Sequence, residues 1–321
     1  MNQPSCKLSV VSPVYGAEDI VDELVRRVRE ELGKLDLPGG YEIILVEDGS
    51  PDHCWDRIME NCERHREVRG IKLSRNFGQH AAIEAGLANA TGDHIVVMDC
   101  DLQEDPAYIG VLLDKARQGH DVVFTSRGAR NYSPVKNFTA WLFRLVGTAL
   151  LPKSGRVNYD LRIGTMSLIS PQVARAFQEL GDFHKPYTAI LGWLGFNAAV
   201  VEIEHRERFS GKSSYGYFRL LMHALNGIIV YSERPLYISV FVGFVFVGLS
   251  TLYGLVILFR ALFMDAPATG WASLITAVVF TSGVVLVNLG ISSLYLGKVF
   301  QQAKGRPRYV IDRNISAADD A

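Results

Sequence analysis

The chain has 321 residues, of which 48% are hydrophobic and 21% charged, and this length suits two domains or one large domain with an appended segment. Its 33 basic and 34 acidic side chains leave a net charge of −1, so no overall basic field indicates nucleic acid as a partner. The four cysteines show no CxxC pair or metal-ligand spacing, which is typical of free thiols in a reducing compartment. The N-terminal segment lacks a basic start followed by an apolar run, so we expect no cleavable signal peptide and a cytoplasmic first domain.

Short apolar runs alternate with helix-like stretches between residues 7 and 130. Crossovers of this length are typical of parallel βαβ units. The sequence therefore predicts an α/β fold with an open, mostly parallel, doubly wound sheet, in which ligands bind beyond the carboxyl ends of the strands. The expected strands are 7–15, 41–50, 69–74, 94–99 and 121–126, and the expected helices are 17–35, 56–66, 78–90 and 108–119.

Polar residues gather where three of these strands end. Each alone has an ordinary explanation, because Asp-Gly-Ser is common in turns and acidic residues cap helices. Three acidic strand ends at one edge of a sheet instead indicate a ligand site. The residues are Pro13, Tyr15 and Glu18 at the first strand, Glu47, Asp48, Gly49 and Ser50 at the second, and Asp99 and Asp101 at the fourth.

Asp99 and Asp101 stand one residue apart, directly after an apolar run. Both can reach one divalent cation, and Mg²⁺ is typically held by one or two carboxylates while substrate phosphates complete its shell. Such a cation neutralises charge on a leaving diphosphate. Glu104 and Asp105 are instead expected to form the acidic first turn of the helix that starts near Pro106.

Several other chemistries lose support because their motifs are missing. The chain has neither GxxxxGK[ST] nor a GxGxxG after the first strand, which disfavours kinase-like and dinucleotide-dependent activities. It also lacks the GxSxG nucleophile elbow. The chemistry that the sequence still supports is a diphosphate bound through a metal ion at the acidic strand ends.

Two long stretches without charge lie near the C-terminus, at 235–259 and 266–297. Each exceeds the roughly 20 residues that cross a bilayer core, and neither has the polar face of a soluble helix. We expect transmembrane helices at about 236–259 and 272–296. The positive-inside rule places both outer flanks in the cytoplasm, because the basic residues are Arg234 before the pair and Lys298, Lys304, Arg306 and Arg308 after it.

Just upstream, residues 213–233 show helical periodicity, with Phe218, Leu221, Leu225 and Ile228 at spacings of three and four. The pattern predicts a helix in the membrane interface. An amphipathic helix packed on the soluble domain fits it equally well.

Four segments resemble the family 2 glycosyltransferases with a GT-A fold, in particular the polyprenyl-phosphate glycosyltransferases. They are SVVSPVYGAED, ILVEDGSPD, LSRNFGQHAAIEAGLANATGDHIVVMDCDLQEDP and RFSGKSSYGYFRL. That group includes dolichyl-phosphate mannose synthases and bacterial undecaprenyl-phosphate glucosyl- and aminoarabinose-transferases. The resemblance covers nearly the whole chain. It implies a cytoplasmic GT-A domain at 1–212, an interfacial helix region at 213–233, two transmembrane helices within 234–300 and a cytoplasmic tail at 301–321.

The resemblance also implies the reaction. One sugar would pass, with inversion, from a UDP- or GDP-sugar to a membrane polyprenyl phosphate, expected to be undecaprenyl phosphate, for cell-envelope glycan or lipid modification. A phosphate monoester is largely dianionic at neutral pH, so it needs positioning cations more than a general base. The enzyme would be a homo-oligomer in the cytoplasmic membrane with both termini in the cytoplasm, and Mg²⁺ or Mn²⁺ would be its cofactor.

Site residues follow from the same resemblance. Pro13, Tyr15, Glu18, Asp48 and Asp99 would bind the nucleotide sugar, Asp99 and Asp101 would hold the metal, and Gln103 would sit beside metal and sugar. Arg127, Arg206, Arg208, Lys212 and Ser213 would bind the acceptor phosphate, although a solvated charge run is the ordinary alternative for this basic cluster. The residues expected to act in catalysis are Asp99, Asp101, Gln103, Arg127 and Arg208.

The chain departs from the family pattern in places. Ser214 stands where relatives have a lysine, so Lys212 is expected to substitute for it. Relatives often carry Asp-x-Gly-Asp-Phe-Arg, whereas Arg162 and Thr165 occupy its two aspartate positions here. Asp160 is the nearest carboxylate, and the sequence does not assign it as a base.

Two other functions stay open at the level of sequence. One is a membrane-bound family 2 transferase with another acceptor, such as a polysaccharide or diacylglycerol, although the Gln-x-x-Arg-Trp element of processive synthases is missing. The other is a non-catalytic scaffold or flippase partner, which the retained Asp48, Asp99, Asp101 and Arg208 disfavour.

Overall fold

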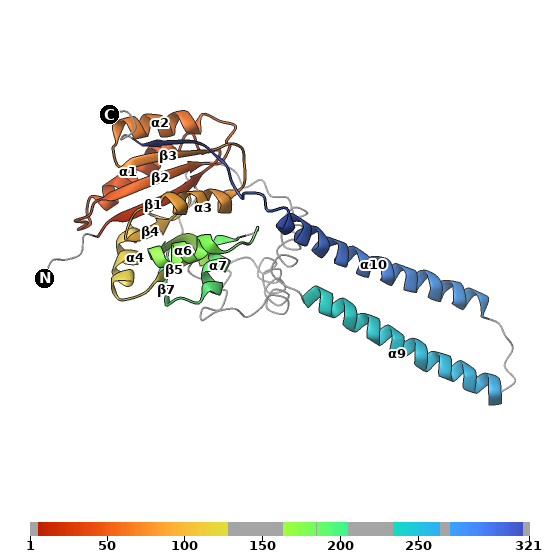
Figure 1. Ribbon diagram of the computed structural model, residues 1–321. Coiled ribbons are helices and arrows are strands. Elements are labelled where there is room, and N and C mark those ends of the chain that lie inside the picture. Colours follow the sequence, from red (N-terminus) through yellow and green to blue (C-terminus); the bar gives the residue numbers. More distant parts are fainter. Residues whose placement is uncertain (1–5, 128–162, 184, 205–233, 264–269, 317–321) are drawn as a thin grey trace. The chain divides into compact units, whose positions relative to one another are not determined.

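The computed structural model describes residues 6–127, 163–183, 185–204, 234–263 and 270–316. The chain divides into two compact units, one with a sheet and its covering helices and one with two long helices (Figure 1). The first unit contains β1 (Leu8–Val14), α1 (Val21–Leu32), β2 (Tyr41–Glu47), α2 (Cys54–Arg64), β3 (Val68–Leu73), α3 (Gln79–Asn89), β4 (His94–Val97), α4 (Tyr108–Arg117), β5 (Val122–Arg127), β6 (Ile163–Ile169), α6 (Pro171–Glu179), α7 (Tyr187–Leu194), β7 (Ala198–Ile203) and β8 (Ile311–Ser316). The second contains α9 (Arg234–Phe263) and α10 (Trp271–Ala303).

Within these residues the strands form one sheet in the order β7-β5-β6-β4-β1-β2-β3-β8. The pairs β1–β2, β1–β4, β2–β3 and β5–β7 are parallel. β6 runs antiparallel between β4 and β5, and β8 runs antiparallel at the β3 edge. The predicted α/β fold with a mostly parallel sheet is therefore confirmed, and the antiparallel strands are additions to it.

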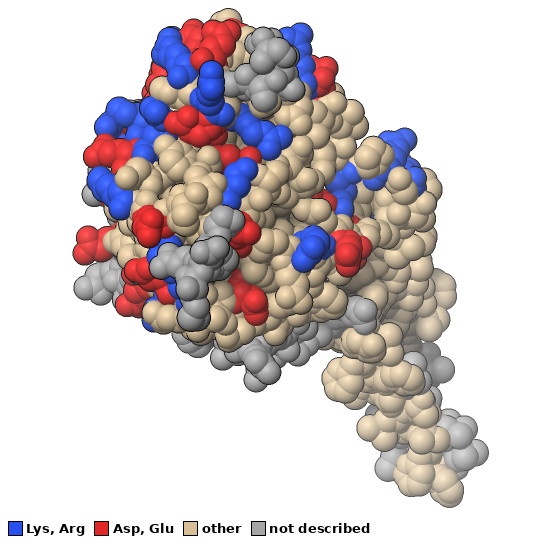
Figure 2. Space-filling model, turned by 60° about the vertical axis from the view of Figure 1, so that its left-hand side comes forward, with Lys and Arg blue, Asp and Glu red and all other residues tan. Residues whose placement is uncertain are grey.

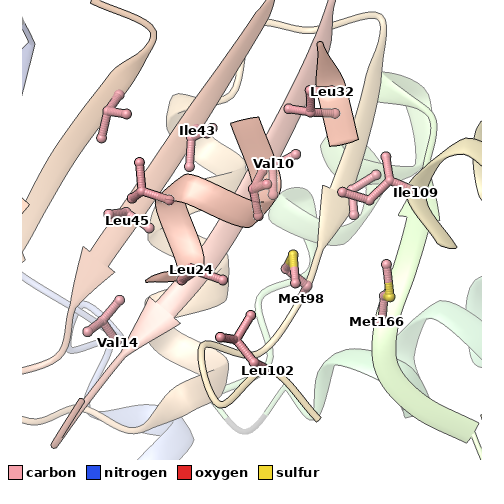
Figure 3. Packing of buried hydrophobic residues seen from close by; sticks show 14 of the residues in the cluster. Val10, Val14, Leu24, Leu32, Ile43, Leu45, Met98, Leu102, Ile109 and Met166 are labelled. Atoms are coloured by element: carbon pink, nitrogen blue, oxygen red, sulfur yellow. The ribbon is translucent and has the colours of Figure 1, made fainter. Parts of the chain in front are cut away.

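The two faces of the sheet pack beneath different helices. α1, α2 and α4 cover one face, and α3, α6 and α7 cover the other. Because side chains alternate along a strand, Val10 and Val14 of β1 belong to the first layer and Val11 to the second. Figure 3 shows the first layer, in which Leu24 of α1 packs with Val10 and Ile43. Each such side chain contributes about 1.5–3 kcal/mol when fully buried.

The segment after α10 returns to the first unit, which the sequence did not predict. β8 pairs with β3, with Ile71 opposite Asn314. Arg308 donates hydrogen bonds to the carbonyl oxygens of Leu180 (3.1 Å) and Asp182 (2.8 Å). The C-terminal segment is thus an edge strand of the sheet.

α9 and α10 are long and apolar enough to cross a membrane, over Pro235–Val256 and Ala277–Ala303, and none of either window is buried within protein. Phe246 of α9 and Phe280 of α10 lie 5.4 Å apart between ring centroids. Large side chains along both helices are open to their surroundings; Phe244, for example, is 73% exposed. A water-soluble protein rarely exposes so much continuous apolar surface, so the helices fit the two expected spans. The helix expected at 213–233 lies outside the described residues.

Charged side chains of both signs are interspersed on the face of the molecule in Figure 2, as the near-zero net charge leads one to expect. All four cysteines are free. Cys54 is buried, and burial raises the pKa of its thiol to about 12, so it stays protonated at neutral pH.

Candidate functional site

The carboxyl ends of β1, β2 and β4 meet at one edge of the sheet. Val14 lies opposite Glu47, and Val11 lies opposite Val97 in the parallel pairing. The Met98 N–H extends this alignment by donating to the Val11 carbonyl at 3.0 Å. The polar residues that follow these strands therefore share one edge, as their places in the sequence led us to expect.

Asp48, directly after β2, is 3% exposed and binds backbone rather than open solvent. Its two carboxylate oxygens accept the N–H groups of Phe77 (2.7 Å) and Gly78 (2.8 Å). Burial raises the pKa of Asp48, and the two N–H donors oppose that shift. Asp48 thus holds the loop that carries the RNFGQ sequence, and its direct contact with a nucleotide stays a prediction.

Two glycines allow this loop to approach. Gly49 has a φ of +61°, and a Cβ there would overlap the backbone of Arg75 and Asn76. Gly78 has a φ of +96° at the position before α3, a conformation that residues with a Cβ rarely adopt. The loop Ser74–Gly78 is therefore pressed against the end of β2 by backbone contact as well as by Asp48.

The Asp99 carboxylate lies at the start of α3. Its Oδ1 accepts a hydrogen bond of 2.6 Å from the side-chain amide nitrogen of Gln79. Asp101 Oδ1 accepts the N–H of Gln103 at 3.1 Å, which closes a short turn around the intervening residue. Asp99, Asp101 and Gln103 are thus brought to one loop.

The intervening residue, Leu102, has a φ of +55°, which is unusual for a leucine. Its side chain is 3% exposed and packs in the same layer as Met98 and Leu24 (Figure 3). The left-handed conformation costs about 1–2 kcal/mol, and burying a leucine returns about 1.5–3 kcal/mol. Core packing therefore maintains the turn that holds the two aspartates.

Glu104 corrects one expectation. It is not part of a helix first turn, because α4 begins at Tyr108 and Glu104 is 4% exposed. Its Oε2 accepts the N–H of Met166 in β6 at 2.9 Å, and its Oε1 occupies the space that a Cβ at Gly164 would need. Glu104 therefore ties the Asp99–Gln103 loop to β6. Asp105 does act near the helix start, where its Oδ1 accepts the N–H of Ala107 at 3.1 Å.

The ends of β1 and β2 are joined by polar contacts. Glu18 Oε2 accepts the N–H of His53 at 3.2 Å, and Asp52 Oδ2 accepts the N–H of Glu18 at 3.1 Å. Ser50 Oγ accepts the N–H of Gly16 at 2.8 Å. Tyr15, at the end of β1, is 53% exposed, so its ring is open to a ligand.

Asp99 and Asp101 suit a divalent cation that also binds phosphate. No group of three or more His, Cys, Asp or Glu in the described parts of the chain is placed to hold a metal ion. Two carboxylates are sufficient for Mg²⁺ when substrate phosphates supply the remaining oxygen ligands. The donor set therefore fits a metal that binds together with its substrate.

Most of the expected acceptor residues lie outside the described residues. These are Arg206, Arg208, Lys212 and Ser213. Asp160, the nearest carboxylate to the changed family motif, also lies outside the described residues. The backbone of Arg127 ends β5, whose partner β7 pairs with it in parallel. The acceptor-phosphate site stays a prediction.

The fold and this acidic edge are typical of α/β proteins that bind a ligand beyond the carboxyl ends of their parallel strands. Residues 9–177 match the glycosyl transferase family 2. An uncharacterized glycosyltransferase of Synechocystis sp. is 32% identical over 306 residues, which cover 95% of this chain and 94% of that protein. The bactoprenol glucosyl transferase of Shigella phage SfII is 31% identical over 312 residues, or 96% and 98% of the two chains. The chain therefore belongs to glycosyl transferase family 2, and it is a glycosyltransferase.

Among solved structures, glucosyl-3-phosphoglycerate synthase from Mycobacterium tuberculosis in complex with phosphoglyceric acid is similar, with a TM-score of 0.48. It is 19% identical, and the match covers 70% of this chain and 79% of that one. A likeness of this degree carries no ligand over to the present chain.

Proposed function

We propose that this enzyme transfers a single sugar from a UDP- or GDP-sugar to undecaprenyl phosphate, with inversion at the anomeric carbon. The observation that carries the proposal is the match, over nearly the full length of both chains, to bactoprenol glucosyl transferases of Shigella phages SfII and SfV. The product would serve cell-envelope glycan synthesis or lipid modification.

The acidic strand ends supply the donor side of the reaction. Pro13, Tyr15, Glu18 and Asp48 would surround the nucleotide, and Asp99 and Asp101 would hold Mg²⁺ or Mn²⁺ beside its diphosphate. The metal would neutralise the charge that develops on the leaving nucleoside diphosphate. Gln103, whose N–H is held by Asp101, would lie beside the sugar.

The acceptor supplies its own nucleophile. An oxygen of the lipid phosphate would form a bond to the anomeric carbon while the bond from that carbon to the donor diphosphate breaks. Arg127, Arg206, Arg208, Lys212 and Ser213 would position this dianion, because bidentate arginine contacts orient phosphate well. We assign no general base.

Chain connectivity supports a membrane topology with both flanks on one side. The strands β1–β7 precede α9, whereas β8 follows α10 and pairs with β3 of the same sheet. The segments before α9 and after α10 must therefore lie on the same side of the membrane, and two spans satisfy this condition. The basic residues at both ends of the pair agree with it. We place the catalytic unit and the termini in the cytoplasm, at the inner membrane.

The same connectivity supports a domain division in which β8 belongs with the sheet. We propose a GT-A domain at 1–212 that is completed by β8, an interfacial helix region at 213–233 and two spans within 234–300. Residues 301–321 would thus contribute a strand as well as a tail. A homo-oligomer is proposed from the family resemblance alone.

A screen of radiolabelled nucleotide sugars tests the proposal. Full-length protein in detergent would be incubated with undecaprenyl phosphate and Mn²⁺, and label entering the lipid phase would be counted. Transfer from one donor is the expected result. Label that appears only with diacylglycerol or a polysaccharide would indicate a different acceptor, and failure to bind any nucleotide diphosphate would favour a scaffold.

A further inference from the structure

The start of α3 joins two parts of the site. Gln79, the first residue of the helix, bonds Asp99, and the two residues before it, Phe77 and Gly78, are bonded by Asp48. A side chain at the end of β2 thereby fixes a loop that in turn holds a side chain at the end of β4. The RNFGQ sequence, whose chemical role the family resemblance leaves open, lies at this junction.

The backbone of Gln79 is fixed from both directions. On its N-terminal side, Asp48 and the backbone contact at Gly49 hold the loop. On its C-terminal side, α3 lies flat on the sheet, where Gly86 packs so closely on Val11 that a Cβ would overlap it. The backbone of Gln79 is therefore held in place at both ends, and accurate positioning of Asp99 by its side chain requires such support.

The direction of the hydrogen bond follows from chemistry. An ionised carboxylate only accepts, so the amide nitrogen of Gln79, rather than its oxygen, faces Asp99. The bond of 2.6 Å occupies one position on Oδ1, and a carboxylate offers about four such positions. A single hydrogen bond of this kind orients a carboxylate and does not by itself prevent it from coordinating a cation.

A purely structural role explains Gln79 less well. Its side chain is exposed, and Gly78 provides no side-chain cap for α3, so burial and helix capping do not account for the contact. Partners that hydrogen-bond a metal ligand orient it and tune its affinity, and their loss typically costs about 10–100-fold in metal affinity or activity.

We propose that Gln79 is a positioning residue for Asp99, which it holds in the orientation that binds the divalent cation with the donor diphosphate. The inference rests on the proposed function, because it requires Asp99 to be a metal ligand. Asp48 supports the same arrangement one step further away, through the backbone of the loop.

The test measures Mn²⁺ binding rather than activity. Full-length protein in detergent is titrated with Mn²⁺ in the presence of saturating UDP, and of GDP in parallel, and free Mn²⁺ is followed by electron paramagnetic resonance. Gln79→Ala removes the amide, and Gln79→Met keeps the length of the side chain without a donor. Gln118→Ala serves as a matched control, because Gln118 is an exposed glutamine at the end of α4.

Both Gln79 variants should raise the Kd for Mn²⁺ by about 10–100-fold, whereas Gln118→Ala should leave it unchanged. Thermal unfolding without metal should shift by less than about 2 °C in all three, because the substitutions are on the surface. Mn²⁺ affinity within about twofold of wild type in both Gln79 variants would overturn the inference alone. Wild-type protein that binds no Mn²⁺ with either diphosphate would overturn the proposed metal role and the inference with it.

Discussion

Arg308, beyond the end of α10, forms an ion pair with Glu84 in the middle of α3. Glu84 also forms an ion pair with Lys185, whose Nζ lies 3.3 Å from Glu84 Oε1. The side chains of Glu84 and Lys185 are 5% and 2% exposed. The guanidinium adds hydrogen bonds to the carbonyl oxygens of Leu180 and Asp182. Through Arg308, the C-terminal segment is therefore bound to α3, the helix that begins with Gln79.

Replacing Arg308 with alanine should destabilise the first unit by about 2 kcal/mol. The change leaves Glu84 with one cationic partner and removes two charge-assisted hydrogen bonds, whereas the partial exposure of Arg308 limits the loss. Urea or thermal unfolding of the full-length protein in detergent would measure it. Arg313→Ala is the control, since Arg313 lies on β8 with a side chain that is 61% exposed. Equal stability of the two variants would refute this role of Arg308.

Replacing Glu104 with alanine should cost about 1–3 kcal/mol, because the N–H of Met166 then loses its acceptor within the core. Asp105→Ala is the neighbouring comparison. It removes the exposed hydrogen bond from the N–H of Ala107 and should cost about 0.5–1 kcal/mol. If Asp105→Ala proved at least as destabilising in denaturant unfolding, Glu104 would be an ordinary helix-start residue after all.

Asp48→Asn should loosen the RNFGQ loop while keeping the shape of the side chain. Asparagine has a single acceptor oxygen, so one of the N–H groups of Phe77 and Gly78 loses its partner. Hydrogen exchange measured by mass spectrometry should show faster exchange in a peptide that covers 74–79. Unchanged protection there would contradict the role of Asp48 in holding the loop.

Arg208→Ala should chiefly weaken use of the lipid acceptor. We expect a higher KM for undecaprenyl phosphate and an unchanged KM for the nucleotide sugar, since arginine at this position is predicted to bind the acceptor phosphate. Initial rates measured over a range of each substrate distinguish the two. The assignment fails if the acceptor dependence matches that of wild type.

Local patterns were sufficient for much of the fold. The apolar runs that became β1, β2 and β4 were readable because parallel strands buried on both faces are nearly continuous in hydrophobicity, as in Ile43–Val46. The two transmembrane helices could be predicted because a helix that crosses a bilayer needs a long run of residues without charge. β8 was not, because Ile311–Ser316 is mostly polar and becomes a strand only by pairing with β3, more than two hundred residues away in sequence.

The sequence was sufficient to predict which residues form the candidate site, but it did not predict most of the hydrogen bonds between them. Acid after a buried strand marked Asp99 and Asp101, and their shared sheet edge followed from parallel topology. Glu104 gave a misleading local signal, because an acid just before a helix is usually a cap, and only the fold brings Met166 and Gly164 to it. The contact of Gln79 with Asp99 joins residues on successive elements, and nothing in the spacing reveals it.

The most direct test of the central claim is transfer of radiolabelled sugar to undecaprenyl phosphate by wild type and by Asp99→Ala, each as full-length protein. Wild type should place label in the lipid phase, EDTA should abolish this, and added Mn²⁺ should restore it. Asp99→Ala should insert into membranes normally and transfer no label. Undiminished transfer by Asp99→Ala, or by EDTA-treated wild type, would contradict the account.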